Sequence, residues 1–266
     1  MDWETAYENR AAVADSAAIM ARWQAEAAAF RARPGGEPER IACGPGECPH
    51  LDLFRPAGEP AGLAVYLHGG YWQHGTPALY SHLAAGPLAR GRAVAVVGYP
   101  LCPDVRLGAI APAVAAGIAA AAARVPGPLR IAGHSAGGHL ACRMLCPGIL
   151  PDGLLARVAG VLTISGLHDL RPLLRTPLNR ALGMDPAEAR AESPALLEPA
   201  AASVPVTVWA GGAELPELRR QSRILAEIWA GLGQAIRHVE EAGMDHFRVI
   251  EALADPASSI GETWLG

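Results

Sequence analysis

The stretch Leu129-Arg130-Ile131-Ala132-Gly133-His134-Ser135-Ala136-Gly137-Gly138 decides the fold of this chain. Leu129–Ala132 has the length and apolar character of a buried strand, and a helical pattern follows over residues 136–147. Between them lies a G-x-S-x-G turn, which strains the serine backbone so that its Oγ stands clear of the sheet. The flanking glycines are needed because side chains there would clash with the neighbouring strand and helix. We therefore expect Ser135 to be a nucleophile at a strand–turn–helix junction.

Strand-length apolar runs recur on both sides of this turn. They cover residues 62–67, 93–97, 158–164 and 204–210, and residues 236–240 form a more polar run of the kind expected at a sheet edge. Helical patterns lie between them, at residues 77–90, 107–124 and 216–232. Buried strands that alternate with helices indicate an α/β fold with a mostly parallel sheet and helices on both faces.

Two short strands, expected at residues 39–43 and 50–54, bring the sheet to about eight strands. Residues 4–32 carry Ala, Met, Trp and Phe at helical spacing, so they predict an N-terminal helix. Residues 169–205 contain short helical pieces and many prolines, and they predict a small cap over the carboxyl ends of the strands. Since no repeat, linker or composition break divides the chain, residues 1–266 are expected to form a single α/β domain.

The overall composition excludes several classes of protein. The 266 residues are 51% hydrophobic and 18% charged, which is typical of a globular chain. A net charge of −4 provides no electrostatic footprint for nucleic acid or an anionic membrane. The 22 basic residues are all Arg, which excludes any chemistry that needs a lysine amine. The composition therefore argues against nucleic acid and a membrane as partners. A small-molecule substrate is expected, and a homodimer is left open.

Neither a targeting segment nor a metal site is expected. Residues 1–4 are acidic where a signal peptide would be basic, and the apolar stretch 107–125 is mostly Ala, too weak to span a bilayer. Five cysteines, an odd number, favour reduced thiols in a cytoplasm. Cys43, Cys48 and His50 lie close in sequence, but a structural zinc site needs four ligands and no second Cys/His cluster supplies the fourth.

A serine nucleophile needs a general base, which comes late in chains of this fold. Four histidines follow Ser135. His139 lies one turn along the same helix and should point back into the protein, His168 precedes the expected cap, and His238 lies within a strand. His246 follows the last strand, with a glycine nearby that lets its loop approach the serine. We expect His246 to be the base.

The acid that orients this base should follow a strand end between the serine and the histidine. Glu214 is the first carboxylate after the strand at residues 204–210, and Glu217 already enters the next helix. Asp169, after the preceding strand, is the competitor, because some proteins of this fold take the acid from that position. A carboxylate at the start of a helix is also favoured simply by the helix dipole. Glu214 is the expected acid.

The strand at residues 62–67 ends in His68-Gly69-Gly70-Tyr71-Trp72. Acyl-transfer intermediates need backbone N–H donors aimed at the developing oxyanion. A Gly-Gly loop after a central strand can present such donors, together with the residue after the nucleophile. We therefore expect an oxyanion hole formed by Gly69, Gly70, Tyr71 and Ala136; the alternative is a plain tight turn with a packed Trp.

These motifs together resemble the kynurenine formamidase (arylformamidase) group of the α/β-hydrolase superfamily, which also shares features with hormone-sensitive-lipase-like esterases. The similarity covers nearly the whole chain. It rests on Tyr7-Glu8-Asn9-Arg10, the H-G-G-x-W loop at residues 68–72, Tyr99, Leu101 and Pro103, the elbow at 133–139, the segment from Gly211 to Ser222, and Asp245-His246-Phe247. One departure is that eukaryotic members usually carry Asp where Glu214 stands.

The resemblance implies a serine hydrolase that cleaves a formyl amide such as N-formylkynurenine through Ser135, His246 and Glu214. Such a hydrolase needs neither a metal nor an organic cofactor. Trp72 beside the oxyanion loop would suit the small formyl group, and His134 is expected with it in the substrate pocket.

Two other functions stay open on the same fold. One is a carboxylesterase with the same machinery, acting on short-chain acyl esters. The more remote is a non-catalytic binding protein, a class in which a triad member is generally lost, whereas all three positions are filled here. Fold alone does not decide between these functions.

Overall fold

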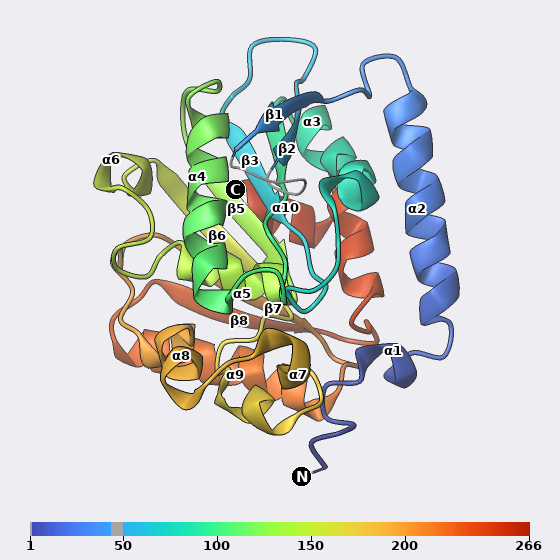
Figure 1. Ribbon diagram of the computed structural model, residues 1–266. Coiled ribbons are helices and arrows are strands. Elements are labelled where there is room, and N and C mark those ends of the chain that lie inside the picture. The colour runs from blue at the N-terminus through green and yellow to red at the C-terminus, as the bar shows by residue number, and fades with distance from the viewer. Residues whose placement is uncertain (1, 44–49) are drawn as a thin grey trace.

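The computed structural model describes residues 2–43 and 50–266, and in these ranges eight strands form one sheet (Figure 1). The strand order is β1-β2-β4-β3-β5-β6-β7-β8; β1 and β2 run antiparallel to their neighbours, and all pairs from β4 to β8 are parallel. The bounds are β1 Glu39–Ala42, β2 His50–Phe54, β3 Leu63–Leu67, β4 Ala93–Val97, β5 Leu129–His134, β6 Val158–Ile164, β7 Val206–Gly211 and β8 Ile236–Glu241.

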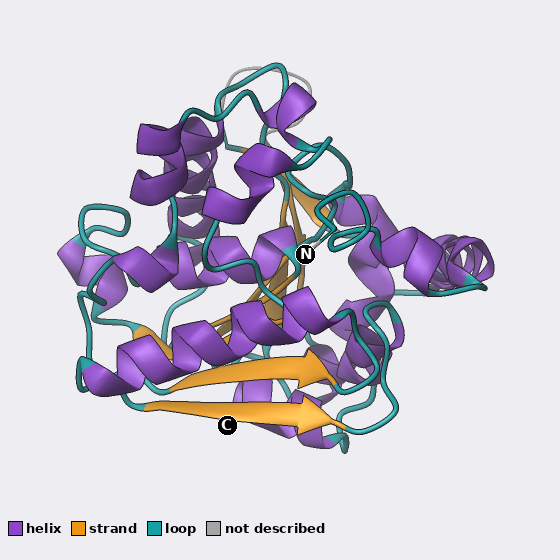
Figure 2. Cartoon of the chain, turned by 90° about the horizontal axis from the view of Figure 1, so that it is seen from below, coloured by secondary structure: helices purple, strands orange, loops and turns teal. Residues whose placement is uncertain are grey.

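Helices cover both faces of the sheet. The α-helices are α1 Asn9–Ala12, α2 Ser16–Ala32, α3 Ala85–Ala89, α4 Ile110–Ala122, α5 Ala136–Arg143, α6 Asp152–Leu155, α7 Asn179–Leu182, α8 Pro186–Ala191, α9 Pro216–Gly231 and α10 Ser259–Leu265. Short 3₁₀ helices are η1 Pro77–Ala84, η2 Leu107–Ala109, η3 Arg171–Arg175, η4 Pro194–Leu196 and η5 Arg248–Ala254. Figure 2 shows one long helix along two neighbouring strands at an end of the sheet; it is α9, which packs on β7 and β8.

The alternation of side chains along the strands divides the core into two layers. In β3, Leu63, Val65 and Leu67 belong to the layer that α4, α5 and α9 complete. The side chains between them, Ala64 and Tyr66, belong to the opposite layer, with α2, η1, η5 and α10. Successive residues of a strand point to opposite faces, so a strand buried on both faces is apolar at every position. This explains the continuous apolar runs in the sequence.

The α/β fold class with about eight strands is confirmed, and the polar run at residues 236–240 is edge strand β8. The expected helix at 4–32 is wrong as one unbroken element. The chain is extended at Val13, which separates α1 from α2. The break has a physical reason: the residues before α2 turn towards the carboxyl ends of the strands, where Tyr7 is anchored to α9.

The segment between β6 and β7 contains η3, α7, α8 and η4, within the range expected to form a cap. A buried ion pair joins it to α5: Nε of Arg143 donates to Oε2 of Glu192 at 3.0 Å. In addition, Nε2 of His139 lies 2.7 Å from the Glu192 carbonyl oxygen, for which it is the donor. These contacts hold this segment on the helix that follows the G-x-S-x-G turn.

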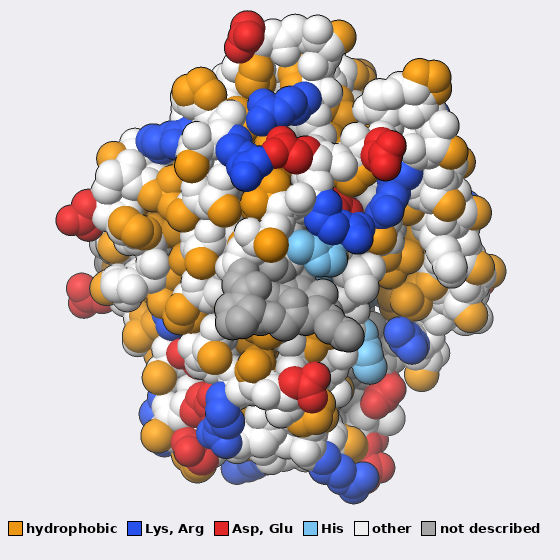
Figure 3. All heavy atoms as spheres, turned by 45° about the horizontal axis from the view of Figure 1, so that its top comes forward, with side chains coloured by type: hydrophobic (Ala, Val, Ile, Leu, Met, Phe, Trp, Pro, Cys, Tyr) orange, Lys and Arg blue, Asp and Glu red, His pale blue; other side chains and the backbone are white. Residues whose placement is uncertain are grey.

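The described part of the chain has no helix with the length and apolar character needed to cross a membrane. On the described part of the face in Figure 3, acidic and basic side chains are interspersed among apolar and neutral ones. Mixed charges of this kind agree with the small net charge of the sequence and provide no extended basic surface there.

Candidate active site

Four of the loops that carry the candidate residues follow parallel strands. The candidate oxyanion loop, residues 68–72, follows β3; Ser135 follows β5, Glu214 follows β7 and His246 follows β8. The carboxyl ends of parallel strands meet at one edge of a sheet, which is where ligands bind in α/β folds. Gly69 and Phe247, which are 178 positions apart in the chain, therefore line the same cavity, whose volume is about 310 Å³.

Ser135 has the strained backbone that its motif predicts, with φ 55° and ψ −117° between β5 and α5. The glycines on both sides permit this turn. A Cβ on Gly133 would lie 2.0 Å from the Gly137 carbonyl oxygen, and a Cβ on Gly137 would lie 2.0 Å from the Leu67 carbonyl oxygen. Side chains at these positions are therefore sterically excluded, and the turn can hold Ser135 tightly against the sheet.

His246 and Glu214 form a buried hydrogen-bonded pair. Nδ1 of His246 lies 2.9 Å from Oε2 of Glu214, and both side chains are almost fully buried. A carboxylate oxygen can only accept here, so Nδ1 carries the proton. This tautomer leaves Nε2 of His246 with a free lone pair, as a general base requires.

The other oxygen of Glu214 is fixed by two donors. The Gly211 N–H donates to Oε1 at 2.6 Å, and the hydroxyl of Ser165 donates to the same atom. Ser165 directly follows β6 and has a positive φ of 52°, so the end of that strand turns its hydroxyl towards the carboxylate. The sequence analysis did not identify Ser165; a serine directly after a central strand is the only signal for it.

The two competing carboxylates lie in other hydrogen-bond networks. Both oxygens of Asp169 accept from the Arg171 guanidinium, at 2.8 and 2.9 Å. Both oxygens of Glu217 accept from Arg220, at 2.7 and 2.8 Å. Among the hydrogen bonds of residues 2–43 and 50–266, His246 Nδ1 has Glu214 as its carboxylate partner.

Ser135 and His246 both line the cavity. Within the described ranges, however, no hydrogen bond joins Ser135 Oγ to the His246 imidazole. Hydrogen bonds between nucleophile and base are commonly long in structures without substrate and tighten in the reacting complex. The structure thus brings the two side chains to the same cavity and leaves the last contact to be formed.

The loop after β3 lies directly beside the serine. A Cβ on Gly69 would lie 3.2 Å from the Cβ of Ser135. The backbone amides of Gly70, Tyr71 and Ala136 have no acceptor among the described hydrogen bonds. For Ala136 this is expected, because the first amides of a helix have no intrahelical acceptor. Free N–H groups next to a serine can serve as donors to an oxyanion.

His68 supports this loop through a hydrogen bond and a stacked ring. Its Nδ1 donates to the Gly69 carbonyl oxygen at 2.8 Å, and its ring stacks on Tyr99 with centroids 4.3 Å apart. The hydroxyl of Tyr99 in turn donates to the His68 carbonyl oxygen at 2.7 Å. Burial lowers the pKa of His68 to about 4, so the ring is neutral near pH 7. His68 is therefore a structural support for the loop.

The expectation that Trp72 lines the substrate pocket is wrong. Trp72 is fully buried, and among the described residues it does not belong to the cavity lining. The cause is the backbone: Tyr71 and Trp72 both have positive φ, 51° and 57°, and the indole packs edge-on against His139 with centroids 5.0 Å apart. It is Tyr71 that lines the cavity.

His134 does line the cavity, and it also supports the loop of the candidate base. Its Nε2 donates to the His246 carbonyl oxygen at 2.8 Å, and the two rings lie 4.6 Å apart. Burial, and secondarily the neighbouring His246, lowers the pKa of His134 well below its usual value. A neutral His134 beside His246 adds no positive charge that would oppose protonation of the base.

The remaining histidines after Ser135 lie outside the cavity lining. His139 is fully buried and bonded to the Glu192 carbonyl oxygen, as its place on α5 predicts. His168 is fully buried, with Nε2 3.2 Å from the Thr163 hydroxyl. His238 lies on β8 opposite Val208.

The N-terminal segment forms one wall of the cavity, on the side where the resemblance places an aromatic amine leaving group. Tyr7, Glu8, Asn9 and Arg10 line the cavity, and Met20 and Trp23 of α2 continue that wall. In the sequence, residues 7–10 stand out as one of the motifs that carry the family resemblance, but the sequence assigns no individual roles to them.

Within the described ranges, no three His, Cys, Asp or Glu side chains are grouped as metal ligands would be. Cys48, part of the Cys43/Cys48/His50 set considered for zinc, lies outside the described residues.

Comparison with known proteins identifies the family. Residues 64–249 match the family described by the α/β-hydrolase fold. The chain is 29% identical over 224 residues to a kynurenine formamidase of Danio rerio and 30% identical over 227 residues to one of Salmo salar. Each alignment covers 81% of this chain and 76% of the relative.

Solved structures give the same picture. A protein of Silicibacter sp. TM1040 to which thioesterase activity has been attributed superimposes with a TM-score of 0.95 and 42% identity, over 100% of both chains. A thermostable carboxylesterase cloned from a metagenomic library, 20% identical, shares the fold with a TM-score of 0.71 over 93% of this chain and 96% of its own. The chain therefore belongs to the α/β-hydrolase family and is a kynurenine formamidase-like hydrolase.

Proposed function

We propose that this hydrolase cleaves the formyl amide of an N-formyl arylamine such as N-formylkynurenine, with Ser135 as nucleophile, His246 as general base and Glu214 as the orienting acid. The observation that carries the proposal is the 2.9 Å contact between His246 Nδ1 and Glu214 Oε2, at the cavity that Ser135 lines. A histidine oriented by a carboxylate beside a strained serine is the arrangement that activates a hydroxyl for acyl transfer.

The chemistry follows from these roles. Ser135 Oγ bonds to the formyl carbon while its proton passes to Nε2 of His246. Glu214 stabilises the imidazolium, and amides of the oxyanion loop and Ala136 stabilise the tetrahedral oxyanion. His246 then protonates the amine nitrogen as the C–N bond breaks, which leaves a formyl-serine ester. A water molecule, deprotonated by His246, attacks that ester and releases formate, which regenerates Ser135.

The polar groups of the cavity wall support a charged substrate. Glu8 and Arg10 line the cavity and carry opposite charges, and both are exposed to solvent. N-Formylkynurenine carries an amino-acid carboxylate and ammonium at the end remote from the formyl group. Such a substrate can pair each of its charges with one of these side chains, whereas a simple alkyl ester cannot. The kynurenine formamidase relatives support the same substrate class.

Ester hydrolysis is the second candidate. Its support is the protein at 42% identity to which thioesterase activity has been attributed. A serine, a histidine and an oxyanion hole also suffice for esters and thioesters, because the acyl-enzyme steps are the same.

The two candidates predict opposite orders of substrate preference. We expect kcat/KM for N-formylkynurenine to exceed kcat/KM for p-nitrophenyl butyrate and for a short-chain acyl thioester. Steady-state kinetics of the wild-type enzyme on the three substrates at one pH measures this. A preference for either ester by tenfold or more would assign the protein to the esterases.

Glu214→Gln keeps the side-chain shape but removes the charge that holds the His246 tautomer. We expect kcat to fall by about 10²–10⁴-fold, as in other triads that lose their acid. Glu214→Asp should restore part of this loss, because a shorter carboxylate still accepts from Nδ1. Asp169→Asn is the matched control and should retain far more activity, since Asp169 pairs with Arg171. The assignment fails if the Asp169 variant proves the more damaged of the two.

A further inference from the structure

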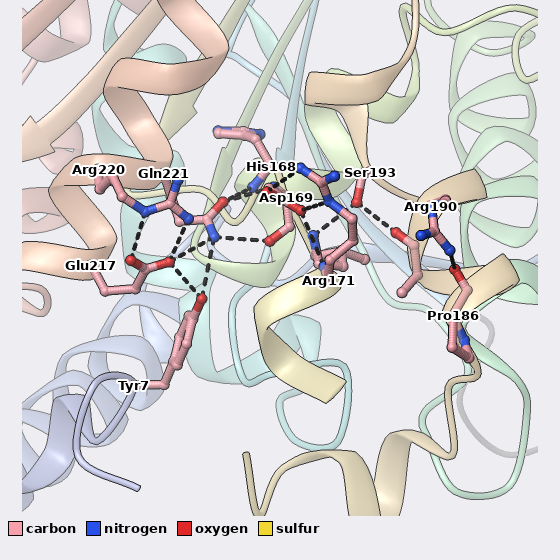
Figure 4. Close-up of polar contacts among 12 residues, drawn as sticks. Tyr7, His168, Asp169, Arg171, Pro186, Arg190, Ser193, Glu217, Arg220 and Gln221 are labelled. Carbon is pink, nitrogen blue, oxygen red and sulfur yellow. Dashed lines mark hydrogen bonds and ion pairs between the residues drawn. The ribbon is translucent and has the colours of Figure 1, made fainter. Parts of the chain in front are cut away.

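The N-terminal segment is fastened to α9 through the phenol of Tyr7. Its hydroxyl donates to Oε1 of Glu217 at 2.7 Å and accepts from Nε2 of Gln221 at 3.3 Å (Figure 4). Tyr7 is 3% exposed, although it lies 210 residues from Glu217 in the chain. A buried phenol that has two polar partners is held in one place, so this contact defines the position of the residues around it.

The anchor for Tyr7 is itself held by hydrogen bonds from Arg220 and Gln221 to Glu217. Burial alone would raise the pKa of Glu217, but hydrogen bonds from Arg220 and Tyr7 outweigh it, and the net pKa is lowered. Gln221 also links this anchor to Asp169, at the start of the segment after β6. Its Oε1 accepts from the Asp169 N–H at 2.7 Å, and its Nε2 donates to the Asp169 carbonyl oxygen at 2.9 Å. Figure 4 shows these side chains as one continuous network from Tyr7 to Arg171.

The N-terminal segment also forms hydrogen bonds with the loop beside Ser135, through Tyr71. The hydroxyl of Tyr71 donates to the Tyr7 carbonyl oxygen at 2.7 Å, and Nδ2 of Asn9 lies 3.0 Å from that hydroxyl. A phenol has one proton, and the carbonyl must receive it, so the hydroxyl accepts from Asn9. This order fixes the orientation of the Asn9 amide. Asn9 is 4% exposed and lines the cavity.

The loop after β3 needs these contacts because its backbone is strained. Tyr71 and Trp72 are consecutive non-glycine residues with positive φ. Such conformations cost free energy and persist only where surrounding contacts hold them. Trp72 is held by burial against His139, and Tyr71 by Tyr7 and Asn9 through its hydroxyl. The N–H groups of Gly70 and Tyr71 lie in this strained stretch, so their direction depends on those contacts.

We propose that Asn9 is a positioning residue for the oxyanion loop, which it holds through the phenol of Tyr71, with Tyr7 as the anchor of the segment. The inference rests on the proposed function, because it takes this loop to be the oxyanion hole. The N-terminal segment then serves the reaction from a distance: it touches no reacting atom, and it keeps the donors at the place where charge develops.

The test compares Asn9→Ala, Asn9→Asp and Tyr71→Phe, with p-nitrophenyl acetate as the substrate. This probe needs the oxyanion hole whether the natural substrate is an amide or an ester. We expect each variant to lower kcat by about 10-fold with KM unchanged, less than the roughly 10²–10³-fold cost of deleting a donor. Asn9→Asp keeps the shape and loses the donor, so it should be as impaired as the alanine variant. The double variant Asn9→Ala/Tyr71→Phe should be no worse than Tyr71→Phe alone.

Ser16→Ala is the matched control. Ser16 is buried in the same region and donates to the Arg10 carbonyl oxygen at 2.9 Å, and none of the hydrogen bonds in the described ranges joins it to Tyr71. It should retain the wild-type kcat, and thermal unfolding checks that all variants are folded.

The outcomes separate the two proposals. Asn9 variants with wild-type kcat, in an enzyme that is active and labelled at Ser135 by a fluorophosphonate, would overturn the positioning role and leave the proposed function intact. A fully active Asn9→Asp would mean that shape and not the donor matters, which also overturns it. A wild-type enzyme that neither reacts with the fluorophosphonate nor hydrolyses any acyl substrate would overturn both.

Discussion

Ser135→Ala is expected to fold like the wild-type enzyme and to lose about 10⁴–10⁶-fold in kcat, as serine hydrolases do when the nucleophile is removed. The reason is that Oγ forms the covalent bond to the acyl carbon in the proposed mechanism. Apart from the phenols of the walls, no other hydroxyl lines the cavity in the described part of the chain. The measurement is kcat on N-formylkynurenine and p-nitrophenyl acetate, with thermal unfolding as the check of folding.

Ser222→Ala is the matched control for this substitution. Ser222 is a fully buried serine on α9 that lies outside the cavity lining. Its loss should leave kcat unchanged. Substantial activity in Ser135→Ala, above that of a preparation without the enzyme, contradicts the assignment of the nucleophile.

His246→Ala should be about as damaging as loss of the serine, since nucleophile and base act as one unit. Without the imidazole, the described part of the cavity lining has no other histidine that is hydrogen-bonded to a buried carboxylate. We expect kcat to fall by about 10⁴–10⁶-fold on both substrates. A pH profile of the residual activity should lack the inflection that the histidine contributes to the wild-type profile.

Two other histidines serve as controls for His246. His238→Ala changes a partly exposed residue of edge strand β8, and His139→Ala removes a buried support of the segment after β6. Both should leave a measurable enzyme, with the His139 variant less stable because it loses a buried contact. If the His238 variant were the inactive one, the assignment of His246 as the general base would be wrong.

The fold could be predicted because the strands are buried on both faces. Ala93–Val97 and Val158–Ile164 have the bounds that their apolar runs predict, since a strand covered by helices on both faces is mostly apolar. Residues 133–134 extend β5 beyond the expected end, because glycine and histidine do not resemble strand residues. The helices after residue 247 were not predicted.

The candidate site could be predicted in part, because its residues follow strand ends. Glu214 and His246 were chosen by that rule, and their side chains meet at 2.9 Å. The direction of the Trp72 side chain could not be predicted, because it depends on two consecutive positive φ angles at non-glycine residues, for which the sequence has no signal. The role of Tyr7 could not be predicted either, since its partner Glu217 is 210 residues away and the contact exists only after the sheet has formed.

Covalent labelling is the most direct test of the claim that Ser135 is the nucleophile of an acyl-transfer triad. A serine-directed fluorophosphonate is incubated with the wild-type enzyme and with Ser135→Ala and His246→Ala, and the modified residue is mapped by peptide mass spectrometry. We predict one adduct in the wild type, on Ser135, none in Ser135→Ala, and greatly slowed labelling in His246→Ala, because the hydroxyl is then no longer activated. An adduct on another residue, or equal labelling of Ser135→Ala, would contradict the triad.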